Sequence, residues 1–152
     1  FKNFESSLSK FSNELGMANS RARLRMTTLY QVAAANKGIV VGTGNKIEDF
    51  GVGFYTKYGD GGVDISPIAD CNKSEVWEIG RELNILKEII DAPPTDGLWD
   101  DGRTDEGQLG LTYKDLEEAM NNLNSPKRVK YEKIRKLNLH KMQAIPICKI
   151  PN

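Results

Sequence analysis

The segment between residues 51 and 67 concentrates side chains that suit a ligand with rings and phosphates. Its aromatic side chains offer faces on which a pyridine or purine ring can stack. Lys57 supplies a point charge for a phosphate or carboxylate, and Asp64 ends the loop as an acceptor for a sugar hydroxyl or an amine. We interpret Asp64 as a ligand contact and not as a support of the fold. A glycine-rich hairpin with scattered charge is the alternative. The glycines that shape the loop are Gly51, Gly53, Gly59, Gly61 and Gly62.

A turn after a short apolar run is a second candidate ligand site. Ile39-Val40-Val41 predicts a short buried strand, and the turn sequence Gly-Thr-Gly-Asn-Lys follows it at residues 42–46. Ligands of α/β proteins bind at the carboxyl ends of parallel strands, where glycines allow a close approach. Glu48 follows this turn, and a carboxylate beside a phosphate site is a usual ligand of Mg²⁺. The spacing alone is equally typical of a surface glutamate.

A helix is expected before that strand. It spans residues 19–36, with Asn19 or Ser20 as its cap, and Gly38 stops it. This helix–strand order indicates an α/β sheet. The helix carries arginines at alternate positions, and residues two apart on a helix do not share a face, so they cannot form one clamp. We expect the first of them to face solvent or another subunit. The arginines are Arg21, Arg23 and Arg25.

Three further helices are expected after the glycine-rich loop. The second helix is capped by Asn72 and the third, over residues 113–124, by Thr112. A fourth, basic helix begins at Ser125-Pro126, with serine as its cap and proline as its first residue. The inner face of the second helix is expected to consist of Val76, Ile79 and Leu83, with Trp77 as a further candidate.

Composition is typical of one soluble globular domain. The 152 residues are 39% hydrophobic and 28% charged, and 21 basic residues balance 21 acidic ones. This balance favours neither a nucleic acid nor a membrane as partner, and no stretch of about 20 apolar residues predicts a membrane span. Residues 91–106 are acidic and 127–141 basic, which indicates either solvated faces or a site for metal and phosphate. Cys71 and Cys148 are expected to be reduced thiols of a cytoplasmic protein.

Several motifs together resemble the NAD synthetase family. The resemblance covers residues 19 to about 146 and is carried most specifically by Tyr-Gly-Asp-Gly-Gly-x-Asp at 58–64 with Thr-Asp-Glu at 104–106. The other matching motifs are Asn19-x-x-Ala22-Arg23-x-Arg25-Met26, Gly42-Thr43-Gly44-Asn45-Lys46-x-Glu48, Phe54-Tyr55-Thr56-Lys57, Pro67, Lys73, Pro93-Pro94-Thr95, Leu98-Trp99, Leu109-Gly110 and His140-Lys141.

The resemblance implies a ligase that uses ATP and Mg²⁺. In this family ATP adenylates the carboxylate of nicotinic acid adenine dinucleotide (deamido-NAD), and ammonia then displaces AMP to give NAD⁺. The implied fold is a Rossmann-like, doubly wound α/β sheet of the ATP-pyrophosphatase type. The implied assembly is a homodimer with the dinucleotide site at the subunit interface, to which the arginine-bearing helix contributes.

The resemblance also implies roles for individual residues. Glu48 is similar to a magnesium ligand of the family. Contacts to ATP are expected from Thr43, Lys73 and Thr95. Contacts to deamido-NAD are expected from Arg23, Lys57, Asp64, His140 and Lys141.

The sequence also departs from the family. The Ser-Gly-Gly-x-Asp-Ser loop that grips the ATP phosphates does not occur in these residues, and the sequence starts with Phe1. We therefore expect residues 1–152 to be the C-terminal part of a single synthetase domain, present as a partial α/β domain. Ser66 stands where asparagine is common and Asp96 where a small residue is common.

Two alternatives to a synthetase remain. The first is that residues 1–152 are not catalytic and form a module for dinucleotide binding or dimerisation. Another amidating ATP pyrophosphatase, such as a GMP synthetase relative, is disfavoured by the Gly-Asp-Gly-Gly-x-Asp loop and the His-Lys pair.

Overall fold

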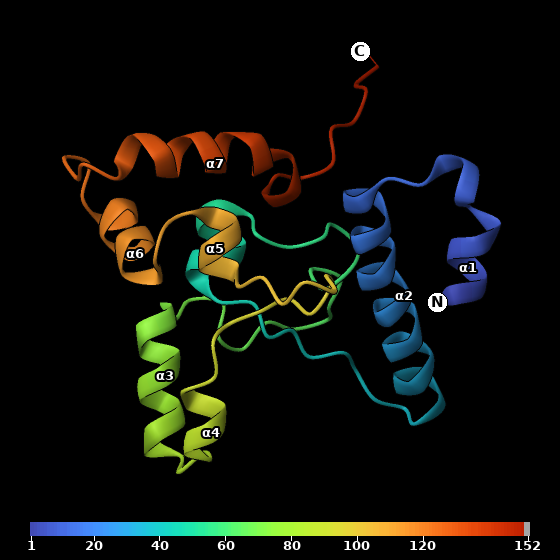
Figure 1. Ribbon diagram of the computed structural model, residues 1–152, viewed down its shortest axis with the longest axis horizontal. Helices are drawn as coiled ribbons and strands as arrows, with labels where there is room; N and C mark the ends of the chain where they lie inside the picture. Colours follow the sequence, from blue (N-terminus) through green and yellow to red (C-terminus); the bar gives the residue numbers. More distant parts are fainter. Residues whose placement is uncertain (151–152) are drawn as a thin grey trace.

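The computed structural model describes residues 1–150 as helices joined by long extended segments (Figure 1). In Figure 1 α2 stands on one side and α3 with α4 on the other, with extended segments between them, while α7 crosses beside α5 and α6. The helices are α1 (Lys2–Ser7), the 3-10 helix η1 (Ser9–Phe11), α2 (Glu14–Ala35), the π-helix η2 (Lys46–Val52), α3 (Lys73–Glu82), α4 (Lys87–Ile90), α5 (Asp105–Leu109), α6 (Tyr113–Asn121) and α7 (Arg128–Met142).

Helix α2 is longer than the sequence pattern predicted. Its cap is Asn13, whose side-chain oxygen accepts the N–H of Gly16 at 2.7 Å, so the prediction of Asn19 or Ser20 as the cap is wrong. The helix ends where expected, because the N–H of Gly38 returns to the carbonyl of Ala33 at 2.8 Å.

The predicted buried strand at residues 39–41 does not form. Within residues 1–150 the β pairing is limited to one parallel bridge, between Val41 and Ile65. Val40 is buried, but Ile39 and Val41 are 59% and 52% exposed. A parallel strand needs hydrogen-bonded neighbours and cover on both faces. The described residues supply one neighbour, since the N–H of Gly42 donates to the carbonyl of Ile65 at 2.7 Å and the N–H of Asp64 to that of Val40 at 2.9 Å, but they leave Ile39 and Val41 uncovered. The expected doubly wound sheet is therefore not formed among them.

Helix α3 begins as predicted but presents a different face to the core. The backbone N–H of Asn72 donates to Glu75 Oε2 at 2.6 Å, which helps to fix the start of the helix. The expected inner face is wrong at Ile79 and Leu83, which are 42% and 68% exposed, but its further candidate, Trp77, is confirmed. The residue that packs against the core is Trp77, whose ring meets that of Tyr113 edge to face at 5.9 Å.

The two C-terminal helices follow their predicted order with shifted ends. Thr112 caps α6 by accepting the N–H of Asp115 at 3.1 Å, and the helix ends at Asn121, short of residue 124. Helix α7 begins at Arg128, so the prediction that it starts at Pro126 is wrong. The Ser125 hydroxyl instead accepts the N–H of Lys127 at 3.2 Å, within the turn before the helix.

The main core lies where η2, α6 and α7 meet. It is built around two large aromatic residues, Tyr113 and Tyr131, which are 1% and 2% exposed. This cluster anchors the π-helix and the first residues of α5 and α6, which carry the polar groups described next. Its other buried members are Ile47, Val52, Leu109, Leu111, Leu116 and Ala119.

Candidate functional site

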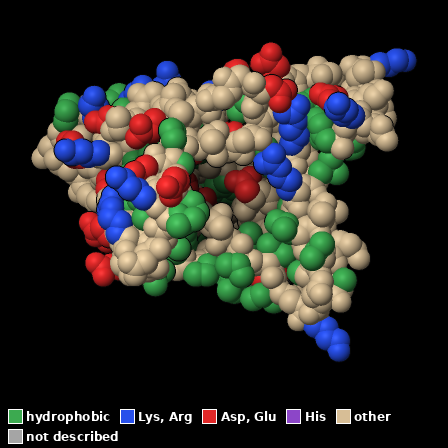
Figure 2. Space-filling view, turned by 60° about the horizontal axis from the view of Figure 1, so that its bottom comes forward, with side chains coloured by type: hydrophobic (Ala, Val, Ile, Leu, Met, Phe, Trp, Pro, Cys, Tyr) green, Lys and Arg blue, Asp and Glu red, His purple; other side chains and the backbone are tan. Residues whose placement is uncertain are grey.

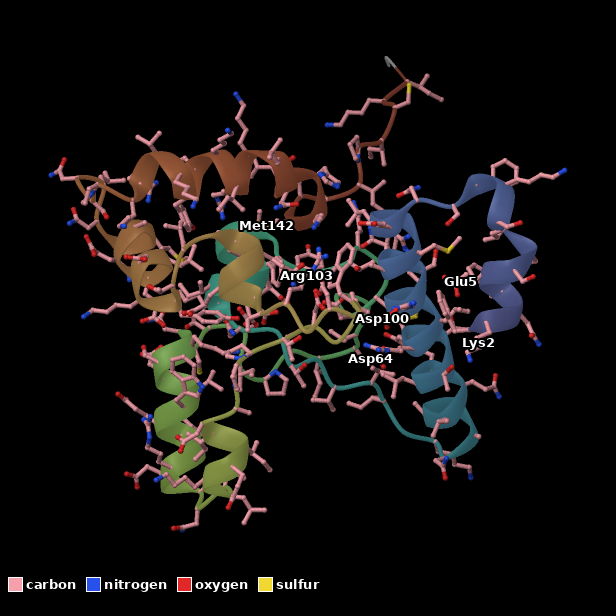
Figure 3. All side chains as sticks on the ribbon, viewed as in Figure 1. Lys2, Glu5, Asp64, Asp100, Arg103 and Met142 are labelled. Carbon is pink, nitrogen blue, oxygen red and sulfur yellow. The ribbon has the colours of Figure 1, made fainter. Side chains whose placement is uncertain are left out.

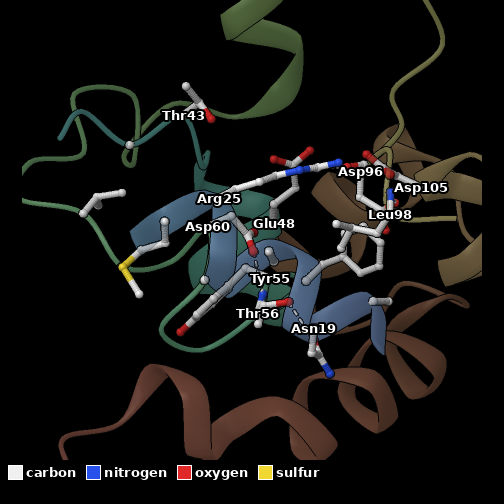
Figure 4. Close-up of a pocket in the computed structure, with 18 of the residues that line it drawn as sticks. Asn19, Arg25, Thr43, Glu48, Tyr55, Thr56, Asp60, Asp96, Leu98 and Asp105 are labelled. Atoms are coloured by element: carbon white, nitrogen blue, oxygen red, sulfur yellow. Dashed lines mark hydrogen bonds between the residues drawn. The ribbon is translucent and has the colours of Figure 1, made fainter. Parts of the chain in front are cut away.

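A cavity of about 680 Å³ opens between α2, the extended segment 40–43 and the loop 94–99 (Figure 4). Figure 2 shows a hollow on one face of the molecule, with acidic side chains around it and hydrophobic side chains beside it. Of the residues predicted to bind ATP, Mg²⁺ or deamido-NAD, five line this cavity: Thr43, Glu48, Lys73, Thr95 and Lys141.

The π-helix η2 places Glu48 at the cavity. Asn45, 1% exposed, precedes the helix, and its side-chain oxygen accepts the N–H groups of Ile47 and Glu48, each at 3.0 Å. The residue pattern predicted a turn at 42–45 and no helix after it, and nothing in that pattern indicates a π-helix. Gly44 lies beside it, where a Cβ would come within 1.9 Å of Asp49 Oδ2, so a larger residue there would displace the Asp49 side chain.

Glu48 sits in a network with two side chains from other helices. Lys73 Nζ lies 3.0 Å from Glu48 Oε1, and the side chains of this pair are only 17% and 14% exposed. The Tyr113 hydroxyl donates to the same Glu48 oxygen, and Lys73 Nζ lies 4.8 Å from the centre of the Tyr113 ring. The metal ligand and one ATP contact that the sequence predicted are therefore brought into direct contact.

Asp105 is a functional candidate whose role the sequence pattern did not predict. It is 7% exposed, its Oδ2 lies 3.2 Å from the Tyr113 hydroxyl, and its Oδ1 is buried without a hydrogen-bond partner in the described residues. Burial raises the pKa of the Asp105 carboxyl, and Glu48 and Asp96 raise it further, whereas the hydrogen bond from Tyr113 opposes this. The signal in the sequence that could have indicated Asp105 is the motif Thr-Asp-Glu at 104–106.

Two more carboxyl groups lie close to the cavity. Burial, followed by repulsion from Glu48 and Asp60, raises the pKa of Asp49 from 3.8 to about 7. Burial likewise raises the pKa of Asp60, although its Oδ1 accepts the N–H of Thr56 at 3.0 Å. The site therefore gathers several carboxyl groups whose charged forms are disfavoured by desolvation, and a cationic ligand or a metal ion would stabilise those charged forms.

The two threonines predicted to contact ATP differ in their surroundings. Thr43 is an exposed residue of the extended segment and lines the cavity directly. Thr95 stabilises its own loop: its hydroxyl donates to the carbonyl of Arg103 at 3.1 Å and accepts the N–H of Gly97 at 3.3 Å.

Three of the residues predicted to bind deamido-NAD form a separate group outside the cavity lining. Lys57 Nζ donates to the backbone carbonyl of His140 at 2.8 Å, and Arg23 Nε donates to the carbonyl of Lys57 at 3.2 Å. Lys141 lies next to this group and reaches the cavity. Its ammonium donates to the carbonyls of Gly53 and Tyr55 at 2.9 and 2.7 Å, and burial lowers its pKa.

Asp64 lies beside α2 (Figure 3), and its hydrogen-bond partners are residues outside that group. Its Oδ2 accepts the N–H of Val40 at 2.8 Å, and its Oδ1 accepts the Tyr30 hydroxyl at 3.2 Å. The interpretation that Asp64 does not support the fold is therefore wrong, since both oxygens join segments distant in sequence.

The arginines of α2 separate by helical face, as predicted. Arg21 and Arg25 share one face and donate to the carbonyls of Leu98 and Gly97 at 2.8 and 2.9 Å, whereas Arg23 turns toward Lys57. The expectation that Arg21 faces solvent or another subunit is wrong, because it holds the 94–99 loop against α2.

Residues 1–150 also bear on metal binding, membrane spans and the state of the two cysteines. No group of three or more His, Cys, Asp or Glu side chains in this part of the chain is arranged to hold a metal ion by itself. Among the same residues no helix is long and apolar enough to cross a membrane. Cys71 and Cys148 are both free thiols, as expected.

Comparison with known proteins identifies the family. The family model for NAD synthase matches residues 1–151, and the chain belongs to this family. The NH(3)-dependent NAD(+) synthetase of Carboxydothermus hydrogenoformans is 51% identical over 104 residues, which cover 68% of this chain and 42% of that protein. The protein of the same name from Alkaliphilus oremlandii is 44% identical over 135 residues, which cover 88% of this chain and 53% of that protein.

Solved structures agree with this assignment. An NMN synthetase from Francisella tularensis matches 98% of this chain and 63% of its own chain, with a TM-score of 0.90 and 32% identity. An NH3-dependent NAD synthetase from Campylobacter jejuni matches with a TM-score of 0.70 and 23% identity over 97% of this chain and 63% of its own, which shows a shared fold. The chain spans about half the length of the curated relatives it matches.

Proposed function

We propose that residues 1–152 form part of the active site of a carbon–nitrogen ligase that converts deamido-NAD to NAD⁺ with ATP and ammonia. The observation that carries this proposal is the convergence of Thr43, Glu48, Lys73 and Thr95 on one cavity, although they come from separate segments of the chain. The curated relatives, which are named for this activity, support it.

The proposed reaction has two steps. A carboxylate oxygen of deamido-NAD attacks the α-phosphorus of ATP, and pyrophosphate leaves. The nitrogen of ammonia then attacks the acyl carbon of the adenylate, AMP leaves, and a proton is released. Both substrates are anions that repel each other, so the protein contributes chiefly by aligning them and by placing cations against their charge.

ATP and its metal ion are assigned to the Glu48 side of the cavity. Mg²⁺ in nucleotide sites takes one or two carboxylates and completes its shell with phosphate oxygens and water. The donor set fits this pattern, because Glu48 lines the cavity and the buried Oδ1 of Asp105 has no partner in the described residues. Glu48 would hold the ion, which would neutralise phosphate charge, while Lys73, Thr43 and Thr95 would contact ATP.

Deamido-NAD is assigned to the side formed by α2, the glycine-rich loop and the end of α7. Arg23, Lys57, His140 and Lys141 are gathered there by hydrogen bonds to backbone carbonyls. An ammonium has three donors, and Lys141 uses two on carbonyls, so one remains for the ligand. We propose Asp64, which accepts the Tyr30 hydroxyl on α2, as a further acceptor for a hydroxyl of deamido-NAD.

The remaining proposals concern the whole protein. We propose that the bridged segments at Val41 and Ile65 are strands of a Rossmann-like doubly wound sheet in the native protein, because their exposed apolar side chains need cover. A homodimer with the dinucleotide site at its interface is proposed from the family resemblance.

The deciding experiment is an assay of NAD⁺ formation by the native, full-length protein with deamido-NAD, ATP, Mg²⁺ and ammonia. Lys73→Ala should lower kcat/KM for ATP by about 10- to 100-fold, the effect of losing one charge-assisted contact worth about 1.5–3 kcal/mol. Lys114→Ala, at an exposed position of α6, is the matched control. A parent protein that binds deamido-NAD but makes no NAD⁺ would favour the non-catalytic module.

A second candidate is amidation of the mononucleotide. The structural likeness to an NMN synthetase, with a TM-score of 0.90, is the observation that favours it. Assaying nicotinic acid mononucleotide beside deamido-NAD separates the two, and a higher kcat/KM for the mononucleotide would replace the first proposal by the second.

A further inference from the structure

Helix α7 donates a series of side-chain hydrogen bonds to the backbone that leads into the glycine-rich loop. Arg135 Nη1 donates to the carbonyls of Phe50 and Gly51, the latter at 2.6 Å. Asn138 Nδ2 donates to the carbonyl of Val52 at 3.0 Å. Lys141 continues the series on the next carbonyls along the chain, as described above. Residues 135, 138 and 141 are spaced so that they lie along one side of the helix.

These contacts supply partners that the π-helix cannot supply itself. The last carbonyls of a helix have no intrahelical partner, and η2 ends at Val52. Gly53 then adopts the left-handed conformation, with φ of 66°, and a Cβ there would lie 2.7 Å from Asn138 Cβ. Glycine thus allows α7 to approach closely enough for Asn138 to reach the carbonyl of Val52.

The loop also donates a hydrogen bond to α7. Lys57, at the far end of the loop, donates to the carbonyl of His140 in the last turn of α7 at 2.8 Å, where carbonyls lack helical partners and a positive charge is favourable. The loop 53–57 is therefore attached to α7 at both of its ends. The basic run at 127–141, which the sequence left open between a solvated face and a phosphate site, serves here in part to bind backbone.

We propose that Arg135 and Asn138 are positioning residues that hold loop 53–57 in the conformation in which it binds the dinucleotide substrate. Neither belongs to the proposed set of ligand contacts, and each bonds carbonyls in the last residues of η2, from which the loop that carries Lys57 continues. This inference rests on the proposed function, because it assigns the loop to deamido-NAD. Its purpose is preorganisation: a loop already held in its bound conformation does not lose conformational freedom on binding.

The first test measures loop stability in the native protein without substrates, by hydrogen–deuterium exchange. The amides of Phe54 and Thr56, which bond to the Glu48 carbonyl at 2.8 Å and to Asp60 at 3.0 Å, report on the loop. Arg135→Ala and Asn138→Ala should each speed their exchange about tenfold, as expected for the loss of about one hydrogen bond. Amides of α6 should not change.

Matched variants separate positioning from charge and folding. Lys136→Ala removes one positive charge from the exposed side of α7 and should leave loop exchange at the parental rate. Arg135→Lys keeps a donor and should restore most of the protection. Asn138→Asp keeps the volume but replaces the donor by an acceptor, so it should act like Asn138→Ala. Loop exchange that is the same in Arg135→Ala, Asn138→Ala and Lys136→Ala would overturn the proposal.

The second test asks whether the held conformation is the one that binds substrate. In steady-state assays both alanine variants should raise KM for deamido-NAD about tenfold while KM for ATP stays within about twofold, since the ATP contacts are on other segments. Equal rises in both KM values would overturn the link to the dinucleotide. If the parent protein makes no NAD⁺, the proposed function fails, whereas the exchange measurement still decides whether α7 holds the loop.

Discussion

Replacing Glu48 by glutamine tests the centre of the site, because it removes the charge and keeps the volume. The exposed ammonium–carboxylate pair of a protein surface is worth at most about 1 kcal/mol, and breaking a fully buried pair costs about 3–5 kcal/mol. The Lys73–Glu48 pair lies between these limits, with side chains 17% and 14% exposed. Since glutamine still offers an acceptor to Tyr113 and Lys73, we expect a loss of about 2 kcal/mol of unfolding free energy.

This loss is measurable in two ways. For a domain of this size about 2 kcal/mol lowers the melting temperature by about 4–8 °C. If Glu48 also holds Mg²⁺, the Mg²⁺ concentration for half-maximal NAD⁺ formation should rise about tenfold or more. The control is Glu78→Gln, the same change at an exposed position of α3, which should alter neither quantity.

A double-variant cycle sharpens the result. Lys73→Met in combination with Glu48→Gln removes both members of the pair, and the double variant should lose less stability than the sum of the single variants. Additive losses, or a melting temperature of Glu48→Gln equal to that of Glu78→Gln, would refute the reasoning that the pair is a stabilising contact. An unchanged Mg²⁺ activation curve would remove Glu48 from the metal site.

Three further predictions follow from other groups. Asp64→Asn should lower kcat/KM for deamido-NAD, and normal kinetics would remove Asp64 from the ligand contacts. Because Asp64 bonds Val40 and Tyr30, the variant should also lose about 1–3 kcal/mol of unfolding free energy, which a lower melting temperature would show. Asp49 has its pKa raised from 3.8 to about 7, so the folded state binds more protons than the unfolded state in that range. Stability should therefore fall as pH rises from about 4 to 7, by at most about 1.4 kcal/mol per unit, and thermal melts of Asp49→Asn should show a shallower pH dependence. Residues 1–152 expressed alone should make no NAD⁺, because they do not contain the Ser-Gly-Gly-x-Asp-Ser loop that grips the ATP phosphates in the family. They should also be poorly soluble or dimerise abnormally, because Ile39 and Val41 are exposed; clear turnover in the NAD⁺ assay would contradict the first expectation.

Much of the helical structure was predictable because its signals are local. Capping residues act within one turn, so Asn72 and Thr112 marked the starts of α3 and α6 correctly. Longer-range effects caused the errors. The segment at residues 39–41 forms only one bridge, to Ile65, and its apolar side chains lack cover among the described residues. The early start of α2 is different, because Asn13 is a local cap that the prediction missed.

The family follows from the sequence, because it depends on which residues occur at which spacing, and the comparison with known proteins confirmed it. The candidate ligand residues were predictable partly as types suited to phosphate, metal and sugar and partly from the family resemblance. It did not indicate what each of them contacts in the folded chain.

Only the tertiary structure decided how these residues are grouped. It joins Glu48 to Lys73 and adds Tyr113 and Asp105, all from different helices, whereas it uses Asp64 to tie Val40 to Tyr30. It also turns Arg135 and Asn138 of a basic helix toward backbone carbonyls. The physical reason is that burial and hydrogen bonding between distant segments depend on packing, and a linear pattern of residue types carries little information about which polar group meets which.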